Sequence, residues 1–476
     1  MPPTRVRARV LGFAFLLAVV TYLDRICISA AAPYIIDDLH LTVLQMSVVF
    51  SAFTLSYSLF EIPSGWLGDV VGPRRVLTRI VLWWSAFTML TAAARGFLSL
   101  VTIRFLFGAG EAGAFPNIAR SFSQWFPIHE RGRANGVMFL GSRVGGMLSA
   151  PVALLIVAQW GWRVSFVLFG TAGIIWAAAW FAWFRDRPDD HPAVNSEELA
   201  WIHGDARPQL REDRDAAETT PWGALLRSRN LYAICAMYFA FGYGLYFYFT
   251  WLPTYLIRQL GFSRFATGAL ASLPFVLAGV ADIAGGWLTD YLSRTRGLRV
   301  GRCYLGFSAF LTCAAMVFAS TLPVPAIAKA VLLALALASA DLALGACWAV
   351  PLDIAPDHAG VITGCMNTLG NLGGLIGPLV VGIAVDRWGS WTFPFYVTAI
   401  VYACGALSWL AIDPTHRLGR EEGTAETAET AENQDRKSKP PMSSAPFAVS
   451  AVSSSSYYGF SLIHTDISPC PRLFQA

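Results

Sequence analysis

The chain has few charged residues for its length. Asp, Glu, Lys and Arg make up 14% of the 476 residues, whereas ordinary soluble domains carry about 25%. Hydrophobic residues reach 55%, and the mean hydropathy is +0.50. This shortage of charge excludes an ordinary water-soluble domain and indicates a membrane protein.

Cysteine and histidine are also scarce. Most of the 8 cysteines lie inside apolar runs without paired spacing, and the 7 histidines are scattered mainly in loops. No nucleophile–base pattern or metal-ligand spacing accompanies them. We therefore expect no enzyme activity, no metal and no cofactor. The net charge of +4 does not indicate nucleic-acid binding, because the basic residues lie in short loops between apolar runs.

Long apolar runs, in contrast, recur along most of the chain. A helix needs about 20 apolar residues to cross the hydrocarbon core of a lipid bilayer. Twelve such runs lie near residues 10–36, 46–67, 76–95, 98–119, 134–158, 163–184, 231–257, 266–288, 302–320, 325–350, 361–385 and 391–412. The pattern predicts an all-α polytopic membrane protein with twelve transmembrane helices.

Arginine in alternate loops predicts the orientation of these helices. Basic residues follow the second, fourth and eighth runs, at 74–79, 131–133 and 294–302. Loops rich in Lys and Arg stay in the cytoplasm, so an even number of spans places both termini there. A secretory signal peptide is the alternative for the N-terminus, but Asp24-Arg25 interrupts its apolar stretch. We expect a multi-pass monomer in the cell (inner or cytoplasmic) membrane.

An internal repeat divides the chain into two related parts. Gly65-Trp66-Leu67-Gly68-Asp69 after the second span returns as Gly286-Trp287-Leu288-Thr289-Asp290 after the eighth. Gly145-Gly146 and Trp160-Gly161 return as Gly373-Gly374 and Trp388-Gly389. The prediction is two pseudo-symmetric six-helix halves at 1–184 and 231–412, a cytoplasmic linker at 185–230 and a disordered cytoplasmic tail at 413–476.

Charged residues inside the apolar runs mark the candidate site. An ionised side chain near the bilayer centre costs roughly 2.5 to 3.5 kcal/mol, so such residues are functional candidates. Asp24 and Arg25 are adjacent in the first span. Arg104 and Glu111 in the fourth span are seven residues apart, which puts them on one helix face. The alternative for each pair is a static ion pair that fixes helix packing.

Four segments carry a resemblance to a known family. Gly65-x-x-x-Asp69-x-x-Gly72-Pro73-Arg74-Arg75 resembles the cytoplasmic signature of the major facilitator superfamily, although Val70 and Pro73 replace usual basic residues. Together with Tyr22-x-Asp24-Arg25, Arg104-x-x-x-Gly108-x-Gly110-Glu111 and Thr250-Trp251-Leu252-Pro253-x-Tyr255, it resembles the anion:cation symporter branch. The resemblance covers residues 10–412. It implies the major facilitator fold and transport of organic anions, as in carriers of hexuronates, galactonate and glucarate.

The resemblance also implies roles for single residues. Asp24 and Glu111 are expected to couple protons, and Arg25 is expected to bind the substrate carboxylate. The predicted substrate-binding set is Arg25, Tyr57, Arg104, Arg143, Tyr243, Tyr246 and Asn371. The predicted gating set is Asp69, Arg74, Arg75 and Asp290.

Several interpretations stay open at this point. Arg143 is either a second carboxylate clamp or a side chain that extends toward the cytoplasm. The tyrosines of the seventh span either occlude a ligand or form a packing stripe. Asp282 and Asp341 have no assigned role.

The predicted function is proton-coupled symport of a small organic anion, a sugar acid, by alternating access. The partners are this anion, protons and the lipid bilayer. Efflux of a drug or neutral metabolite on the same fold is one alternative. A receptor or scaffold that transports nothing is the other.

Overall fold

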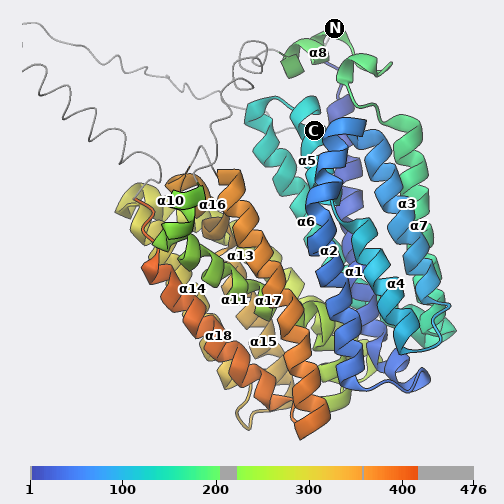
Figure 1. Ribbon diagram of the computed structural model, residues 1–476, viewed down its shortest axis with the longest axis vertical. Coiled ribbons are helices and arrows are strands. Elements are labelled where there is room, and N and C mark those ends of the chain that lie inside the picture. The colour runs from blue at the N-terminus through green and yellow to red at the C-terminus, as the bar shows by residue number, and fades with distance from the viewer. Residues whose placement is uncertain (1–2, 204–221, 356–358, 416–476) are drawn as a thin grey trace, which may run out of the picture. The chain divides into compact units, whose positions relative to one another are not determined.

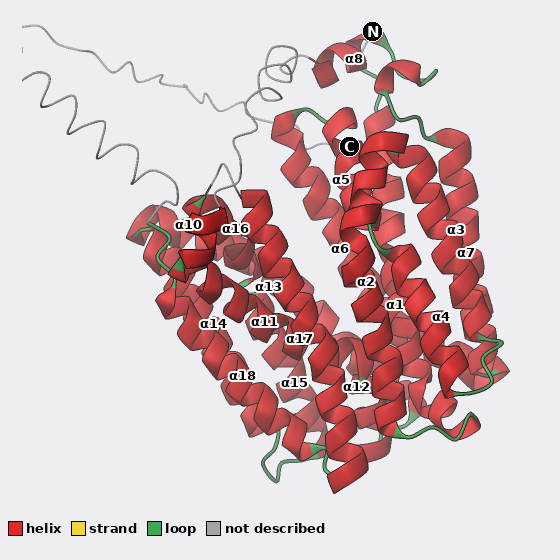
Figure 2. Cartoon of the chain, viewed as in Figure 1, coloured by secondary structure: helices red, strands yellow, loops and turns green. Residues whose placement is uncertain are grey.

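Helices form almost all of the described chain, and no strand occurs within it. The computed structural model describes residues 3–203, 222–355 and 359–415 (Figure 2). These residues belong to one compact unit, Met1–Arg420. Of the predicted tail, only residues 413–415 fall within the described ranges. The boundaries of the halves, linker and tail stay predictions.

The N-terminal spans come from seven helices. The fourth span is broken into α4 and α5, and each of the others is one continuous helix. The helices are α1 (Val6–Asp38), α2 (Val43–Val71), α3 (Pro73–Thr91), α4 (Phe97–Glu111), α5 (Ala114–Trp125), α6 (Ile128–Trp160) and α7 (Trp162–Trp183). Short elements follow at η1 (Pro188–Asp190), α8 (Ser196–His203) and α10 (Trp222–Arg227).

The C-terminal spans repeat this plan. The tenth span is again broken in two, and short π-helical segments adjoin the seventh and ninth. The elements are α11 (Arg229–Thr250), α12 (Leu252–Thr254), η2 (Tyr255–Gln259), α13 (Arg264–Arg296), η3 (Arg299–Tyr304), α14 (Leu305–Ala319), α15 (Ala326–Asp341), α16 (Leu344–Ile354), α17 (Ala359–Trp388) and α18 (Thr392–Ala411).

Eleven spans of the described chain are long and apolar enough to cross a bilayer. The remaining predicted span is α3, which has 19 residues and begins with Pro73-Arg74-Arg75. Its first two turns also contain Arg79. These three arginines, and not a short length, lower the mean hydropathy of α3. Pro73 suits the first helical position because its missing N–H has no partner to lose there.

The sequence repeat corresponds to a structural repeat. The helices α6 and α17 contain 33 and 30 residues, carry an internal proline, and end at Trp160 and Trp388. A glycine with positive φ follows each, at 81° for Gly161 and 60° for Gly389. Glycine adopts these angles without a Cβ clash, which explains why Trp-Gly recurs at the same place in both halves.

The two sets of spans contact each other through α2 with α17 and α6 with α13 (Figure 1). Asp386, near the end of α17, accepts hydrogen bonds from the backbone N–H groups of Val43 (3.0 Å) and Leu44 (2.8 Å). Arg258 donates to Asp37 at 2.5 Å. These contacts lie at the end of the bundle away from the arginine-rich turns at 72–75 and 297–302.

Candidate functional site

Arg25 of α1 and Glu111 of α4 form a buried ion pair. The Nε and Nη2 atoms of Arg25 both donate to Oε1 of Glu111, Nε at 3.0 Å. The side chains are 9% and 1% exposed. Burying two charges costs several kcal/mol per ion and often brings no net stability. The pair therefore points to a role beyond holding the helices together.

Aromatic rings surround the guanidinium of Arg25. Its Cζ lies 4.9 Å from the ring centre of Tyr57, 5.1 Å from Phe53 and 5.3 Å from Tyr22. Cation–π contacts of this kind contribute about 2 kcal/mol or more when desolvated. They hold Arg25 in place independently of which carboxylate occupies its hydrogen-bonding edge.

Asp24 and Arg104 lie beside this pair. Both are buried, with 1% and 2% of their surface exposed. Cζ of Arg104 lies 4.2 Å from the ring centre of Phe107, and Asp24 is within electrostatic range of Arg104 and Glu111. In the described chain, both Asp24 oxygens and the Nε and Nη1 atoms of Arg104 lack hydrogen-bond partners. Asp24, Arg25, Arg104 and Glu111, hereafter the N-terminal cluster, are thus brought together.

Helix geometry explains how this cluster forms. Adjacent residues on a helix are about 100° apart, so Arg25 faces the rings of α2 while Asp24 faces α3 and α4. The helix α4 ends at Glu111 because the chain turns at Ala112 and Gly113, whose φ is 87°. Helix α5 then begins at Ala114. The break places the Glu111 carboxylate at the end of a helix inside the membrane.

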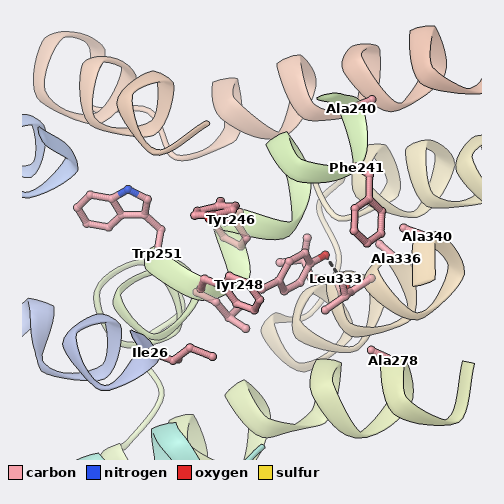
Figure 3. Close-up of a cluster of buried hydrophobic side chains, with 14 of the residues drawn as sticks. Ile26, Ala240, Phe241, Tyr246, Tyr248, Trp251, Ala278, Leu333, Ala336 and Ala340 are labelled. Atoms are coloured by element: carbon pink, nitrogen blue, oxygen red, sulfur yellow. Dashed lines mark hydrogen bonds between the residues drawn. The ribbon is translucent and has the colours of Figure 1, made fainter. Parts of the chain in front are cut away.

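One tyrosine of α11 reaches the N-terminal cluster. Tyr246 lies within electrostatic range of Arg25 and packs on Phe249 at 5.6 Å between ring centres. Tyr248, on the opposite face of α11, donates a hydrogen bond to the carbonyl of Leu333 at 2.7 Å (Figure 3). Tyr248 is therefore anchored in its own half, and Tyr246 faces the other.

The other two predicted C-terminal ligands lie elsewhere. Tyr243 is 4% exposed and packs near Phe239, with 6.3 Å between ring centres. Asn371 is half-buried on α17. Within the described chain, neither forms a hydrogen bond, ion pair or ring contact with Arg25 or Glu111. Their substrate-binding roles stay predictions.

Arg143 forms a second charged cluster, which joins helices from both halves. Its Nε donates to Oδ2 of Asp282 on α13 at 2.7 Å, and its Nη2 lies 3.0 Å from Oδ2 of Asp341 on α15. The exposed fractions are 17% for Arg143, 25% for Asp282 and 0% for Asp341. We call these three residues the inter-half cluster. Arg143 already holds two carboxylates here.

Two of the predicted gating residues, Arg74 and Asp290, contact residues of their own halves. Arg74 donates from Nε (3.0 Å) and Nη2 (2.6 Å) to the carbonyl of Phe181. Asp290 lies 3.3 Å from Arg302. Arg75 is exposed and makes no ion pair with a described residue, and the Asp69 side chain is outside the described part. The described contacts thus include no bridge between the halves at the arginine-rich turns.

Comparison with known proteins decides the family. A family description for the Major Facilitator Superfamily matches residues 14–378 and again residues 305–466. The chain belongs to the major facilitator superfamily. A probable sulfoacetate transporter of Cupriavidus necator is 36% identical over 86% of this chain and 94% of its own.

Two further relatives match the predicted branch of the superfamily. A hexuronate transporter of Bacillus subtilis is 31% identical over 81% of this chain and 90% of its own. A D-galactonate transporter of Escherichia coli is 30% identical over 86% and 96%. The resemblance to the anion:cation symporter branch is therefore confirmed, as is the prediction that this chain is not an enzyme.

Solved structures confirm the superfamily fold. A bacterial homologue of the human lysosomal transporter Spinster, in an inward-facing and occupied conformation, gives a TM-score of 0.70. The match has 17% identity and covers 86% of this chain and 97% of that one. A D-xylose–proton symporter gives a TM-score of 0.66 at 15% identity over 85% and 98%. The prediction of a multi-pass membrane protein with this fold is confirmed.

Glu61 is a charged residue of this superfamily member that the sequence analysis missed. It lies one turn beyond Tyr57 on α2 and is within electrostatic range of both Tyr57 and Arg25. The sequence could have identified Glu61, because a residue four positions after Tyr57 lies on the same helix face as Tyr57. Asp282 and Asp341 were noticed, but no pattern in the sequence connected them with Arg143.

Proposed function

We propose that this protein is a proton-coupled symporter of a small organic anion, a sugar acid, by alternating access. The observation that carries the proposal is the buried Arg25–Glu111 pair enclosed by Tyr22, Phe53 and Tyr57. A guanidinium presents a planar fork that matches a carboxylate. In this pair, Glu111 occupies the edge that a substrate carboxylate needs.

Protonation of Glu111 is the proposed coupling step. An arginine stays charged at all relevant pH values, so only Glu111 can change charge within the pair. A proton on Glu111 weakens its hold on Arg25 and frees the guanidinium for the substrate. Substrate binding and proton binding then favour each other, as linked equilibria require.

The charge balance of this region also favours uptake of a proton together with the anion. Asp24, Glu61 and Glu111 oppose Arg25 and Arg104, so the region carries one excess negative charge when all groups are ionised. An arriving anion adds another negative charge in a poorly hydrated region. Uptake of a proton offsets this charge and lowers the cost of burial.

The relatives support the class of substrate. Sulfoacetate, hexuronates and D-galactonate, named for three of them, are small acids with a carboxylate. Arg25 suits that group, and the phenols of Tyr57 and Tyr246 suit substrate hydroxyls. Arg104, Arg143, Tyr243 and Asn371 complete the proposed binding set.

The proposed cycle requires a defined orientation and gate. We place the protein as a monomer in the cell (inner or cytoplasmic) membrane, with both termini and the arginine-rich turns in the cytoplasm. In that orientation the Asp386 and Arg258 contacts close the outer side. Asp69, Arg74, Arg75 and Asp290 form the proposed cytoplasmic gate when the halves tilt.

The anion-transport part of the proposal is tested by counterflow in proteoliposomes, and its proton coupling is tested by the pH measurement in the Discussion. Vesicles are loaded with unlabelled galactonate, glucuronate, glucarate or sulfoacetate, and exchange for the labelled acid outside is measured. Exchange of at least one acid above that of empty vesicles is expected. No exchange of any of the four acids, together with transport of a neutral or cationic compound, would favour the efflux alternative over this proposal.

A further inference from the structure

We infer that Arg143, Asp282 and Asp341 form a second proton-binding site, located between the two halves. The proposed function assigns proton coupling to the N-terminal cluster; it uses Arg143 only as a substrate ligand and gives Asp282 and Asp341 no role. The inference concerns proton binding by the substrate-free protein. It therefore holds or fails independently of which anion is transported.

The geometry makes the three residues one electrostatic unit. Arg143 on α6 contacts Asp282 at 2.7 Å and Asp341 at 3.0 Å. Since α6 belongs to one half and α13 and α15 to the other, the unit exists only while the halves are in contact there. Its charge is therefore tied to the conformation of the transporter.

The charge count leaves room for one proton. Two carboxylates against one guanidinium leave one net negative charge when all three groups are ionised. An uncompensated charge in a buried site is costly. One proton shared by the two carboxylates makes the unit neutral, with one ion pair and one carboxylic acid.

Three carboxylate oxygens are available for this proton. In the described chain, Oδ1 of Asp282 and both Oδ atoms of Asp341 are buried and lack hydrogen-bond partners, although Oδ2 of Asp341 lies 3.0 Å from Nη2 of Arg143. A buried ionised carboxylate oxygen without a donor is costly, and protonation of the carboxylate removes that charge. Asp282, which is 25% exposed, gives the proton a route from water to the fully buried Asp341.

Among the described residues, no other charged group lies within electrostatic range of the cluster. The titratable groups within its electrostatic range, on α1, α11, α14, α16 and α18, are phenols and thiols that are neutral near pH 7. They are Tyr22, Tyr238, Tyr248, Cys313, Cys347 and Tyr402. A proton is therefore the group that neutralises the excess negative charge of the cluster.

Protonation of the inter-half cluster stabilises the contact between the two halves. The protonated, neutral cluster is stable while α6 packs against α13. Loss of the proton leaves excess negative charge in the contact, and separation of the halves relieves it by admitting water. The site therefore makes this contact stronger at acidic pH.

Infrared difference spectroscopy of the purified full-length protein, without substrate, tests the inference. On acidification, the wild type is expected to gain carboxylic-acid absorption with one component from this cluster. Asp282→Asn and Asp341→Asn should each lose that component. The one remaining carboxylate and Arg143 then form an ion pair with no net charge, so no proton is needed to neutralise the cluster. Arg143→Gln should increase the absorption, because two carboxylates then face no cation.

Control variants separate this site from others. Asp24→Asn and Glu111→Gln should retain the component, and so should Asp386→Asn at the outer end. Size-exclusion profiles identify any variant that fails to fold, and either Asp282→Asn or Asp341→Asn alone is sufficient for the test. Wild-type absorption in either of these variants, when it is folded, would overturn the inference. So would loss of the component on adding sodium at constant pH, which would assign the site to a metal cation.

Discussion

Glu111 and Asp341 occupy corresponding positions in the two halves of the transporter. Each is the last residue of a helix that breaks inside the membrane, Glu111 ending α4 and Asp341 ending α15. Each is fully buried and pairs with an arginine from another helix, Glu111 with Arg25 and Asp341 with Arg143. The internal repeat has thus placed a buried acid at the same point in the fourth and tenth spans.

The two acids differ in what their arginine joins. Arg25 and Glu111 lie in the same half, so their pair can persist while the halves move. Arg143 and Asp341 lie in different halves, so their pair must break when α6 leaves α13. The first arrangement suits ligand exchange, and the second suits a contact that reports the conformation.

We predict that Glu111→Gln abolishes uphill accumulation and retains exchange. A glutamine cannot take up a proton, but it leaves Arg25 free to bind the anion. Accumulation driven by a pH gradient and counterflow without a gradient are measured on the same vesicles. Asp38→Asn, in an exposed pair with Arg163, serves as the control and should accumulate normally. Normal accumulation by Glu111→Gln would exclude this residue from coupling.

We predict that Arg25→Lys weakens anion binding by about 10- to 100-fold, since a charge-assisted hydrogen bond contributes about 1.5 to 3 kcal/mol. Lysine keeps the charge but loses the planar fork. The half-saturating concentration in counterflow is the readout, and Arg163→Lys at the surface is the matched control. An unchanged value for Arg25→Lys would remove this residue from the binding site.

We predict that Gly113→Ala lowers stability by about 1 to 3 kcal/mol, the usual cost of a non-glycine residue in a sparsely populated backbone region. The φ of Gly113 is 87°, and an added Cβ would meet Ser64. Gly136→Ala is the matched control, because its Cβ would have nothing within 4 Å. Thermal unfolding in detergent is measured for both. Equal melting temperatures would show that the break after Glu111 does not require glycine.

We predict that Asp386→Ala loosens the contact between α17 and the start of α2 by about 0.5 to 2 kcal/mol, the range measured for lost helix N-caps. Asp386 caps α2 from the other half through Val43 and Leu44. The readout is the thiol-labelling rate of Ser47→Cys in a protein without other cysteines, since Ser47 is buried against Gly382. Labelling should become faster. An unchanged rate would mean that Asp386 does not hold α2 and α17 together, as the proposed outer closure requires.

Much of the N-terminal cluster could be predicted from the sequence, because its information is local. Asp24 and Arg25 are adjacent, and Arg104 and Glu111 are two helical turns apart, so intramembrane charge and helix periodicity identify both pairs. The repeats around Trp160-Gly161 and Trp388-Gly389 likewise predicted related halves.

The inter-half cluster could not be predicted in this way. Arg143, Asp282 and Asp341 lie on three helices, and periodicity does not reveal which helices become neighbours. Their pairing follows from the packing of α6 against α13 and of α13 against α15. The opposite faces of Tyr246 and Tyr248 were predictable, but which of them faces Arg25 depends on the same packing.

The most direct test of proton-coupled anion symport is the external pH of lightly buffered proteoliposomes after addition of a transported acid. We predict that the medium becomes more alkaline as wild-type protein carries protons inward with the anion. Asp24→Asn and Glu111→Gln should give no such change, because both buried carboxylates are the predicted proton-coupling residues. Uptake of the labelled acid by the wild type without alkalinisation would contradict the account.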